Sequence, residues 1–215
     1  MAKEDPAKSE WQTVEHALAY LARADKLPHR TEGEKVLLDQ IPPNAKTVLD
    51  LGTGDGRLLA LVRLHNSSVD GVALDFSDPM IERAKKRFAN DRQVSIVKHD
   101  FSLPLSERLG SFDAVVSSLA IHHLTHLGKK QLYTEIFNRL NPQGVFCNLE
   151  RVCSSTENLH LKFLAVAGLT HQMEDPSNKL LDVETQLGWL RQIGFTDVDC
   201  YWKWMEIALL VGVKP

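Results

Sequence analysis

The stretch that decides the fold of this 215-residue chain is Val48-Leu49-Asp50-Leu51-Gly52-Thr53-Gly54-Asp55-Gly56. Its first residues are apolar, as in a buried strand, and its three glycines precede a segment with helical spacing from Arg57 to Leu64. Glycines at such a turn let the backbone bend tightly and leave room for a ligand to rest on the main chain. The stretch therefore predicts a nucleotide-binding turn in an α/β fold.

The spacing of the glycines and the charge beside them distinguish between nucleotides. A dinucleotide-binding turn follows the pattern G-x-G-x-x-G, whose third glycine would fall at position 57, which is Arg57 here. Asp50 would repel a pyrophosphate placed nearby but suits the ammonium of a methionine moiety. These features disfavour a nicotinamide cofactor, and a glycine-rich turn without a ligand is the plain alternative.

Outward from this turn, strand patterns alternate with helix patterns. Strands are expected at 47–51, 69–74, 94–97, 112–117 and 145–149, with helices at 57–64, 78–89 and 129–140. Strands connected by crossovers of this kind predict a parallel sheet. Two later strands, 197–204 and 206–213, have almost no residues between them and predict an antiparallel hairpin at the sheet edge.

We expect a single domain over residues 1–215, because this length fits one hydrophobic core. Its parts are an N-terminal helical cover (1–45), a cofactor-binding core (46–150), a segment that could form a substrate lid (151–181), and a final helix with edge strands (182–215). The cover contains two helix patterns, and capping-box spacing at Thr31 predicts the start of the second. The same spacing at Ser154 predicts a helix start in the possible lid segment. Trp11, Tyr20 and Arg30 could close over a ligand, with packing as the alternative for Trp11 and Tyr20.

Two further carboxylates follow predicted strands. Asp75 comes 19 residues after Gly56, where it is placed to accept hydrogen bonds from both hydroxyls of a ribose. An Asp at such a place is as often a helix cap, but Ser77 already offers a cap here. Asp100 and Phe101 follow the third strand, where such a pair could bind an adenine amino group and cover the ring.

The order of these motifs resembles that of class I S-adenosylmethionine-dependent methyltransferases, in the broad branch that acts on small molecules. The resemblance covers residues 47–150 well and rests on Asp50 to Gly56, Asp75, Asp100-Phe101, Phe112 to Ser118 and Leu140 to Val145. The closing strands are similar to the end of that fold. The resemblance implies a doubly wound, Rossmann-like sheet of seven strands, mostly parallel with an antiparallel last strand.

Carried over by position, the resemblance implies a site for S-adenosylmethionine, with S-adenosylhomocysteine as the product. The residues that would hold its methionine end, ribose and adenine are Asp50, Gly52, Thr53, Gly54, Asp75, Phe76, Met80, Asp100, Phe101, Ser118 and Leu119. Met80 also has helical spacing, so packing in the core is an equal alternative for it.

A histidine pair follows the fourth strand, at the edge where ligands bind in open α/β sheets. His123 is the candidate catalytic residue, since a histidine there can take a proton from the acceptor during methyl transfer. Structural packing is the alternative, because a sulfonium donor does not require a general base in every case. His122 and His126 have the spacing of metal ligands, but a third ligand is not evident, so we expect no metal site.

Composition limits the partners and the location. The formal net charge is −3 and no stretch is strongly basic, which disfavours nucleic acid. The chain has no apolar signal core and no run of 18 apolar residues, and its three cysteines are widely spaced, so we expect a cytoplasmic protein without a membrane partner.

The leading hypothesis is methyl transfer to a small-molecule substrate. A noncatalytic or regulatory S-adenosylmethionine-binding protein and, less favoured, a nicotinamide-dependent oxidoreductase are the alternatives.

Overall fold

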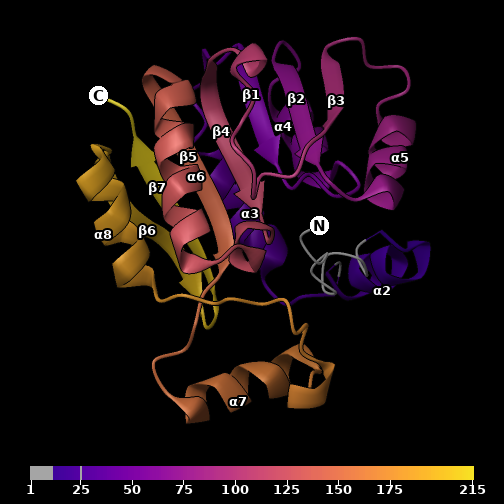
Figure 1. The fold of residues 1–215 in the computed structure, drawn as a ribbon, viewed down its shortest axis with the longest axis vertical. Helices are drawn as coiled ribbons and strands as arrows, with labels where there is room; N and C mark the ends of the chain where they lie inside the picture. The colour runs from indigo at the N-terminus through magenta and orange to yellow at the C-terminus, as the bar shows by residue number, and fades with distance from the viewer. Residues whose placement is uncertain (1–11, 25) are drawn as a thin grey trace, which may run out of the picture.

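The computed structural model describes residues 12–24 and 26–215, so Trp11 lies outside the described residues. A seven-stranded sheet in the order β3-β2-β1-β4-β5-β7-β6 forms the centre, and β7 runs antiparallel to both of its neighbours (Figure 1). This sheet confirms the predicted fold class. The strands are β1 (Thr47–Leu51), β2 (Asp70–Asp75), β3 (Val94–Lys98), β4 (Phe112–Ser118), β5 (Leu140–Arg151), β6 (Thr196–Trp204) and β7 (Ile207–Val213).

Helices cover both faces of the sheet: α3 and α4 pack on one face, and α6 and α8 pack on the other (Figure 1). In the described part of the chain, none of the helices has the length and apolar character needed to span a bilayer. The helices are α2 (Val14–Ala24), α3 (Arg30–Leu38), α4 (Arg57–His65), α5 (Asp78–Arg87), α6 (His126–Arg139), α7 (Glu157–Ala167) and α8 (Val183–Ile193), with single 3₁₀ turns at η1 (Glu107–Leu109), η2 (Ile121–His123) and η3 (His171–Met173).

The apolar run in β1 is explained by burial on both faces. Val48 belongs to the core that includes α3 and α4, and Leu49 belongs to the core that includes α6 and α8. Successive strand residues point to opposite faces, and both of these side chains are fully buried. A continuous apolar pattern, rather than an alternating one, is what a parallel strand with helices on both faces requires.

The predicted start of α7 is wrong. Thr156, not Ser154, is the N-cap, because the Thr156 hydroxyl accepts a hydrogen bond from the N–H of Leu159 and the helix begins at Glu157. The Ser154 hydroxyl donates instead to Oε1 of Glu206 at 2.7 Å. A tertiary partner has therefore replaced the local capping interaction that the sequence predicts.

The predicted capping box of α3 is also wrong. The N-cap is His29, and Glu34, which is 1% exposed, binds two arginines instead of the helix start. Its carboxylate oxygens lie 2.9 Å from Nε of Arg30 and 2.9 Å from Nη2 of Arg57. A buried carboxylate is stable only when it is paired, and these ion pairs join α3 to α4.

Helices α2 and α7 lie beyond the carboxyl ends of the parallel strands, α2 at the right and α7 at the bottom of the view in Figure 1. The hydroxyl of Tyr20 in α2 donates to the carbonyl of Leu119, just after β4. The Gln12 side chain donates to the carbonyl of Phe76 and accepts from the N–H of Asp78. These contacts hold the N-terminal cover over the edge at which open α/β sheets bind ligands.

Candidate active site

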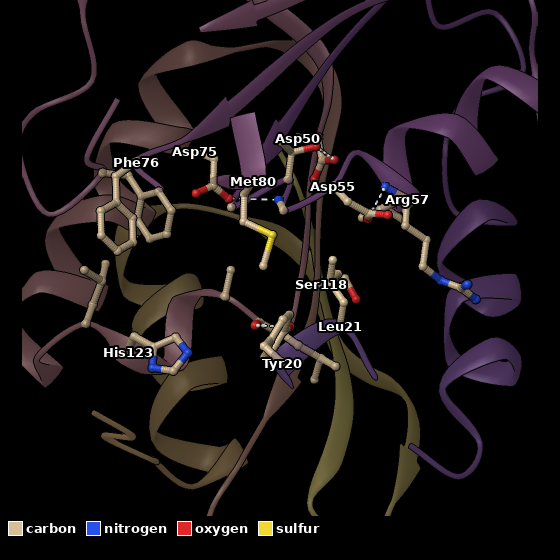
Figure 2. A pocket seen from close by; sticks show the side chains of 18 of the residues that line it. Tyr20, Leu21, Asp50, Asp55, Arg57, Asp75, Phe76, Met80, Ser118 and His123 are labelled. Carbon is tan, nitrogen blue, oxygen red and sulfur yellow. Dashed lines mark hydrogen bonds between the residues drawn. The ribbon is translucent and has the colours of Figure 1, made fainter. Parts of the chain in front are cut away.

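A cavity opens at the carboxyl ends of β1, β2 and β4, against helix α2 (Figure 2). It measures about 1010 Å³ with its open mouth and the solvent in it included. Each cofactor-binding residue expected from the sequence lines this cavity, and so does His123. The lining residues that the sequence did not single out include Leu21, Ala120, Ser177 and Lys179.

The glycine-rich turn between β1 and α4 has a backbone conformation that suits glycine. Gly52 and Gly54 have φ angles of 68° and 58°, in the left-handed region. A Cβ atom at Gly52 would lie 2.2 Å from the Cβ of Ala120, whereas the nearest atom to a Cβ at Gly54 is Sδ of Met80 at 4.0 Å. Position 52 therefore requires glycine for close packing, and Gly54 offers bare backbone to the cavity.

Asp50 lies at the carboxyl end of β1 with its carboxylate buried. Its Oδ2 atom accepts a hydrogen bond from the Thr53 hydroxyl at 2.6 Å, while Oδ1 has no hydrogen-bond partner among residues 12–24 and 26–215. Burial raises the pKa of Asp50 to about 7, against the opposing effect of the Thr53 hydrogen bond. A buried carboxylate oxygen of this kind is suited to receive a cationic group.

Asp75 joins the two turns that border the cavity. Its Oδ2 atom accepts from the N–H of Gly54 at 2.8 Å, and its Oδ1 atom accepts from the N–H of Ser77 at 2.9 Å. Burial raises the pKa of Asp75, and these backbone hydrogen bonds oppose the rise. Each carboxylate oxygen has a second lone pair, so Asp75 retains acceptor capacity toward the cavity.

The end of β4 brings a strained residue and a buried hydroxyl to the cavity. Leu119 has a φ of 55°, which is rare for a side chain other than glycine, and its N–H donates to the carbonyl of Leu149 at 2.8 Å. The Ser118 hydroxyl is buried with no hydrogen-bond partner in the described part of the chain. Strained backbone and unsatisfied polar atoms both concentrate at functional sites.

The aromatic and sulfur side chains expected around an adenine are grouped on one side of the cavity. Cε1 of Phe101 would lie 3.4 Å from a Cβ at Gly52, so this ring packs on the glycine-rich turn. The Asp100 carboxylate accepts a hydrogen bond from the N–H of Ser102. Phe76 and Met80 lie near each other in Figure 2, and Met80, 1% exposed, both lines the cavity and packs inside the fold.

His123 lies at the boundary of this cavity and is held by residues from the segment between β5 and β6. The Ser177 hydroxyl lies 2.7 Å from Nδ1 of His123 and 2.6 Å from Oδ1 of Asp175. A hydroxyl has a single proton, and if it donates that proton to the Asp175 carboxylate, Nδ1 of His123 must be the donor to Ser177. This arrangement leaves Nε2 as the acceptor nitrogen of the ring. Burial lowers the pKa of His123 well below its usual value, which favours the neutral imidazole.

A second cavity of about 1180 Å³, again with its mouth included, adjoins the first. Tyr20, Leu119 and His123 line both cavities. The remaining walls of the second cavity expose mainly apolar surface, although polar and charged side chains also line it. The apolar residues include Leu27, Phe163, Ala167, Leu169, Met173 and Ile207, and the polar and charged ones are Lys26, His122, Arg151, Glu174, Asp175 and Asn178.

His122, the neighbour of His123, has a different environment. Its Nδ1 atom lies 2.6 Å from Oε1 of Glu150, which is fully buried. The Nε2 atom of His126 lies 3.2 Å from the carbonyl oxygen of Leu180. These two histidines are therefore engaged with separate partners and do not face a common point.

Comparison with known proteins places this site in context. The family model described as a methyltransferase domain matches residues 48–144 of this chain. The chain is 22% identical over 182 residues to the carboxy-S-adenosyl-L-methionine synthase of Nautilia profundicola, which covers 78% of this chain and 76% of that protein. It is 30% identical over 141 residues to an uncharacterized methyltransferase of Mycobacterium bovis, which covers 64% of this chain and 68% of that protein.

A solved structure shows the same fold. Human N-acetylserotonin methyltransferase in complex with S-adenosylmethionine superposes with a TM-score of 0.70 at 17% identity. The match covers 100% of this chain and 60% of that one, so this chain spans less than two thirds of that protein's length. The fold of this chain is thus similar to that of a methyltransferase solved in complex with S-adenosylmethionine.

Proposed function

Since this chain belongs to the class I methyltransferases, whose cofactor is S-adenosylmethionine, we propose that it transfers a methyl group to a small-molecule acceptor. The observation that carries the proposal is the pair of adjoining cavities that meet at His123. One cavity has the polar groups that a nucleotide-like cofactor needs, and the other has mostly apolar walls. An enzyme that transfers a group from a cofactor to an acceptor must hold the two molecules next to each other, and two adjoining cavities allow this.

The residues of the first cavity fit the cofactor. The buried Oδ1 atom of Asp50 suits the ammonium of its methionine moiety, and the backbone of Gly54 leaves room beside it. The Asp75 carboxylate retains lone pairs for the ribose hydroxyls, and Phe101 offers an apolar face to the adenine. The Ser118 hydroxyl would bind near the methionine end.

The acceptor is proposed to bind in the second cavity. The chemistry that the bound cofactor supplies is a methyl group activated on a sulfonium. Nε2 of His123 would take the proton that an acceptor hydroxyl or amine loses, and Ser177 with Asp175 would hold the ring in place. The apolar walls exclude water and favour an acceptor with an apolar body. Residues 151–181, which carry α7 and Ser177, would cover it as a lid.

A transfer assay with a panel of small acceptors tests this function. The panel carries hydroxyl, amine and carboxylate nucleophiles on apolar bodies, and the readout is S-adenosylhomocysteine formed above the acceptor-free rate. We expect turnover with at least one class of acceptor. Saturable cofactor binding with no turnover on any class would favour the noncatalytic, regulatory alternative. Turnover confined to structured RNA, weakening steeply with salt, would contradict a small-molecule acceptor.

His123→Asn should lower the turnover number about tenfold and leave the affinity for S-adenosylhomocysteine unchanged. General bases commonly contribute more than this, but a methyl donor that is already activated needs less assistance. The measurement is kcat with the best acceptor from the panel, with His126→Asn as the matched control because His126 lies outside the cavity lining. An unchanged kcat in His123→Asn would assign this histidine to packing.

The affinity for S-adenosylhomocysteine should rise with pH through about pH 7. Burial keeps the pKa of Asp50 near 7, and only its carboxylate form attracts an ammonium, so binding below this pH requires loss of a proton. Calorimetric titrations between pH 5.5 and 8 should show the dissociation constant increasing by up to about tenfold per pH unit below 7. Asp50→Asn should bind more weakly and without this slope. A flat profile in the unmodified protein would exclude Asp50 as the ammonium partner.

A further inference from the structure

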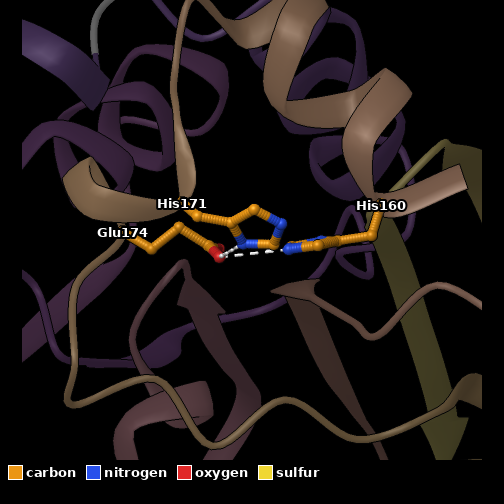
Figure 3. Close-up of side chains that lie close together, drawn as sticks. All are labelled: His160, His171 and Glu174. Carbon is orange, nitrogen blue, oxygen red and sulfur yellow. Dashed lines mark hydrogen bonds and ion pairs between the residues drawn. The ribbon is translucent and has the colours of Figure 1, made fainter. Parts of the chain in front are cut away.

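Three side chains from the segment between β5 and β6 converge on one point (Figure 3). Nε2 of His160 in α7 lies 3.0 Å from Oε2 of Glu174, and Nδ1 of His171 in η3 lies 3.4 Å from the same oxygen. The three donor atoms all lie within 4.8 Å of one another. Two imidazole nitrogens and one carboxylate oxygen form a ligand set that suits zinc and leaves a fourth position open.

The separations between these atoms fit a tetrahedral ion. Ligand atoms bound about 2.0 to 2.2 Å from a tetrahedral zinc lie roughly 3.3 to 3.5 Å from each other. The distances from Glu174 to the two histidines, 3.0 and 3.4 Å, are close to this range. The two histidine nitrogens lie within 4.8 Å of each other, so binding an ion would draw the rings together by up to about 1 Å.

Each histidine is also held from its far side by a carboxylate. Nδ1 of His160 lies 2.8 Å from Oε1 of Glu206, which is fully buried. Nε2 of His171 lies 3.1 Å from Oε1 of Glu157. Histidines that bind metals almost always donate their other N–H to a carboxylate, carbonyl or water, which fixes the ring and its tautomer. Both histidines here have that second partner.

The charge of the cluster suits a divalent cation. Arg151 binds Glu174 through Oε1 at 2.6 Å and Glu206 through Oε2 at 3.1 Å, so Oε2 of Glu174 stays directed at the histidines. The carboxylates of Glu157, Glu174 and Glu206 and the guanidinium of Arg151 sum to a charge of −2 (three negative, one positive), without counting the two histidines. A Zn²⁺ ion would balance this charge.

We propose that His160, His171 and Glu174 bind a zinc ion that ties η3 to α7. Glu174 lines the second cavity and directly precedes Asp175, which holds Ser177 against His123. The ion would therefore fix one wall of that cavity and the segment that positions His123. The site does not depend on the proposed methyl transfer, because its ligands lie outside the first cavity.

Zinc titration of the chelator-treated, metal-free protein tests the site. We expect one Zn²⁺ per chain by calorimetry, a rise in melting temperature of about 5 to 11 °C at a hundredfold excess over the dissociation constant, and no response to Mg²⁺. His171→Ala should weaken zinc binding at least about tenfold and reduce the thermal shift to about half or less. His171 is 53% exposed, so this variant should remain folded without metal. Binding of Co²⁺ should give the visible absorption of a tetrahedral site.

His65→Ala is the matched control, because His65 is an exposed histidine at the end of α4, outside the cluster. Its zinc affinity should equal that of the unmodified protein. Equal zinc affinity in His171→Ala, or no saturable zinc binding by the folded protein, would overturn the proposal. The cluster would then be an ion-pair network in which the histidines themselves carry the balancing charge.

Discussion

Asp75→Ala should weaken the binding of S-adenosylhomocysteine more than about a hundredfold. The carboxylate is proposed to accept hydrogen bonds from both ribose hydroxyls, and a hydrogen bond to a charged group contributes about 1.5 to 3 kcal/mol. Loss of two such bonds corresponds to at least about 3 kcal/mol, where each 1.4 kcal/mol is about tenfold in affinity. The variant also removes the acceptor for the N–H groups of Gly54 and Ser77, which loosens both turns. Calorimetric titration measures the change.

Two controls separate ligand binding from support of the backbone. Asp75→Asn keeps one acceptor oxygen and the shape of the side chain, so its loss of affinity should be intermediate. Asp113→Ala removes a carboxylate that also accepts two backbone N–H groups, from Lys46 and Thr47, but lies outside the cavity lining. Its affinity should be unchanged even if its melting temperature falls. Equal affinities in Asp75→Ala and the unmodified protein would exclude the ribose role.

Gly52→Ala should lower the melting temperature by about 4 to 20 °C and abolish cofactor binding. A left-handed conformation costs a side chain about 1 to 2 kcal/mol, and overpacking adds about 1 to 3 kcal/mol. At position 52 both terms apply, because φ is 68° and the new Cβ would lie 2.2 Å from the Cβ of Ala120. For a chain of this length, 1 kcal/mol shifts the melting temperature by about 2 to 4 °C. Thermal denaturation and calorimetry measure both effects.

Gly168→Ala is the matched control for backbone strain. Gly168 has a φ of 69° and a ψ of 28°, in the left-handed region, but no atom lies within 4 Å of a Cβ placed there. Only the conformational term of about 1 to 2 kcal/mol applies, so the melting temperature should fall by about 2 to 8 °C with unchanged cofactor binding. If the two variants behaved alike, the close contact between Gly52 and Ala120 would have no energetic importance.

The sheet and the first cavity could be predicted because their signals are local in the sequence. The apolar run at Val48 and Leu49 indicates a strand that is buried on both faces, and the glycines after it indicate a tight turn. Asp50, Asp75 and Asp100 each end or follow a parallel strand, and the carboxyl ends of parallel strands share one edge of the sheet. Local pattern and global fold therefore agree for these residues.

The capping boxes at Thr31 and Ser154 were predicted wrongly because tertiary partners replaced local caps, although α3 begins within one residue of Thr31. Glu34 binds Arg57 of another helix, and Ser154 binds Glu206 in the turn between β6 and β7. The motif S/T-x-x-E identifies residues that can cap a helix, but the same residues can bind other partners in the fold more strongly than they bind the helix end. A buried carboxylate takes the charged partner when the fold provides one.

The group around His123 could not be predicted, because its members are brought together only by the fold. Ser177 lies 54 residues after His123 in the chain, in a segment whose sequence reads as an ordinary polar turn. The cluster of His160, His171 and Glu174 likewise has no established metal-binding spacing, although its members are close in sequence. The Asp-Pro-Ser-Asn sequence at residues 175–178 indicates a turn, but it does not indicate which residues the turn contacts.

The most direct test of the central claim, that the cavity at the glycine-rich turn binds the cofactor, is calorimetric titration with S-adenosylhomocysteine. NAD and the Asp75→Ala variant serve as controls. The structure predicts saturable one-to-one binding of S-adenosylhomocysteine, strong weakening in the variant, and no response to NAD. Absence of binding by the folded protein, or binding that Asp75→Ala leaves unchanged, would contradict the claim. Saturable binding of NAD would favour the oxidoreductase alternative.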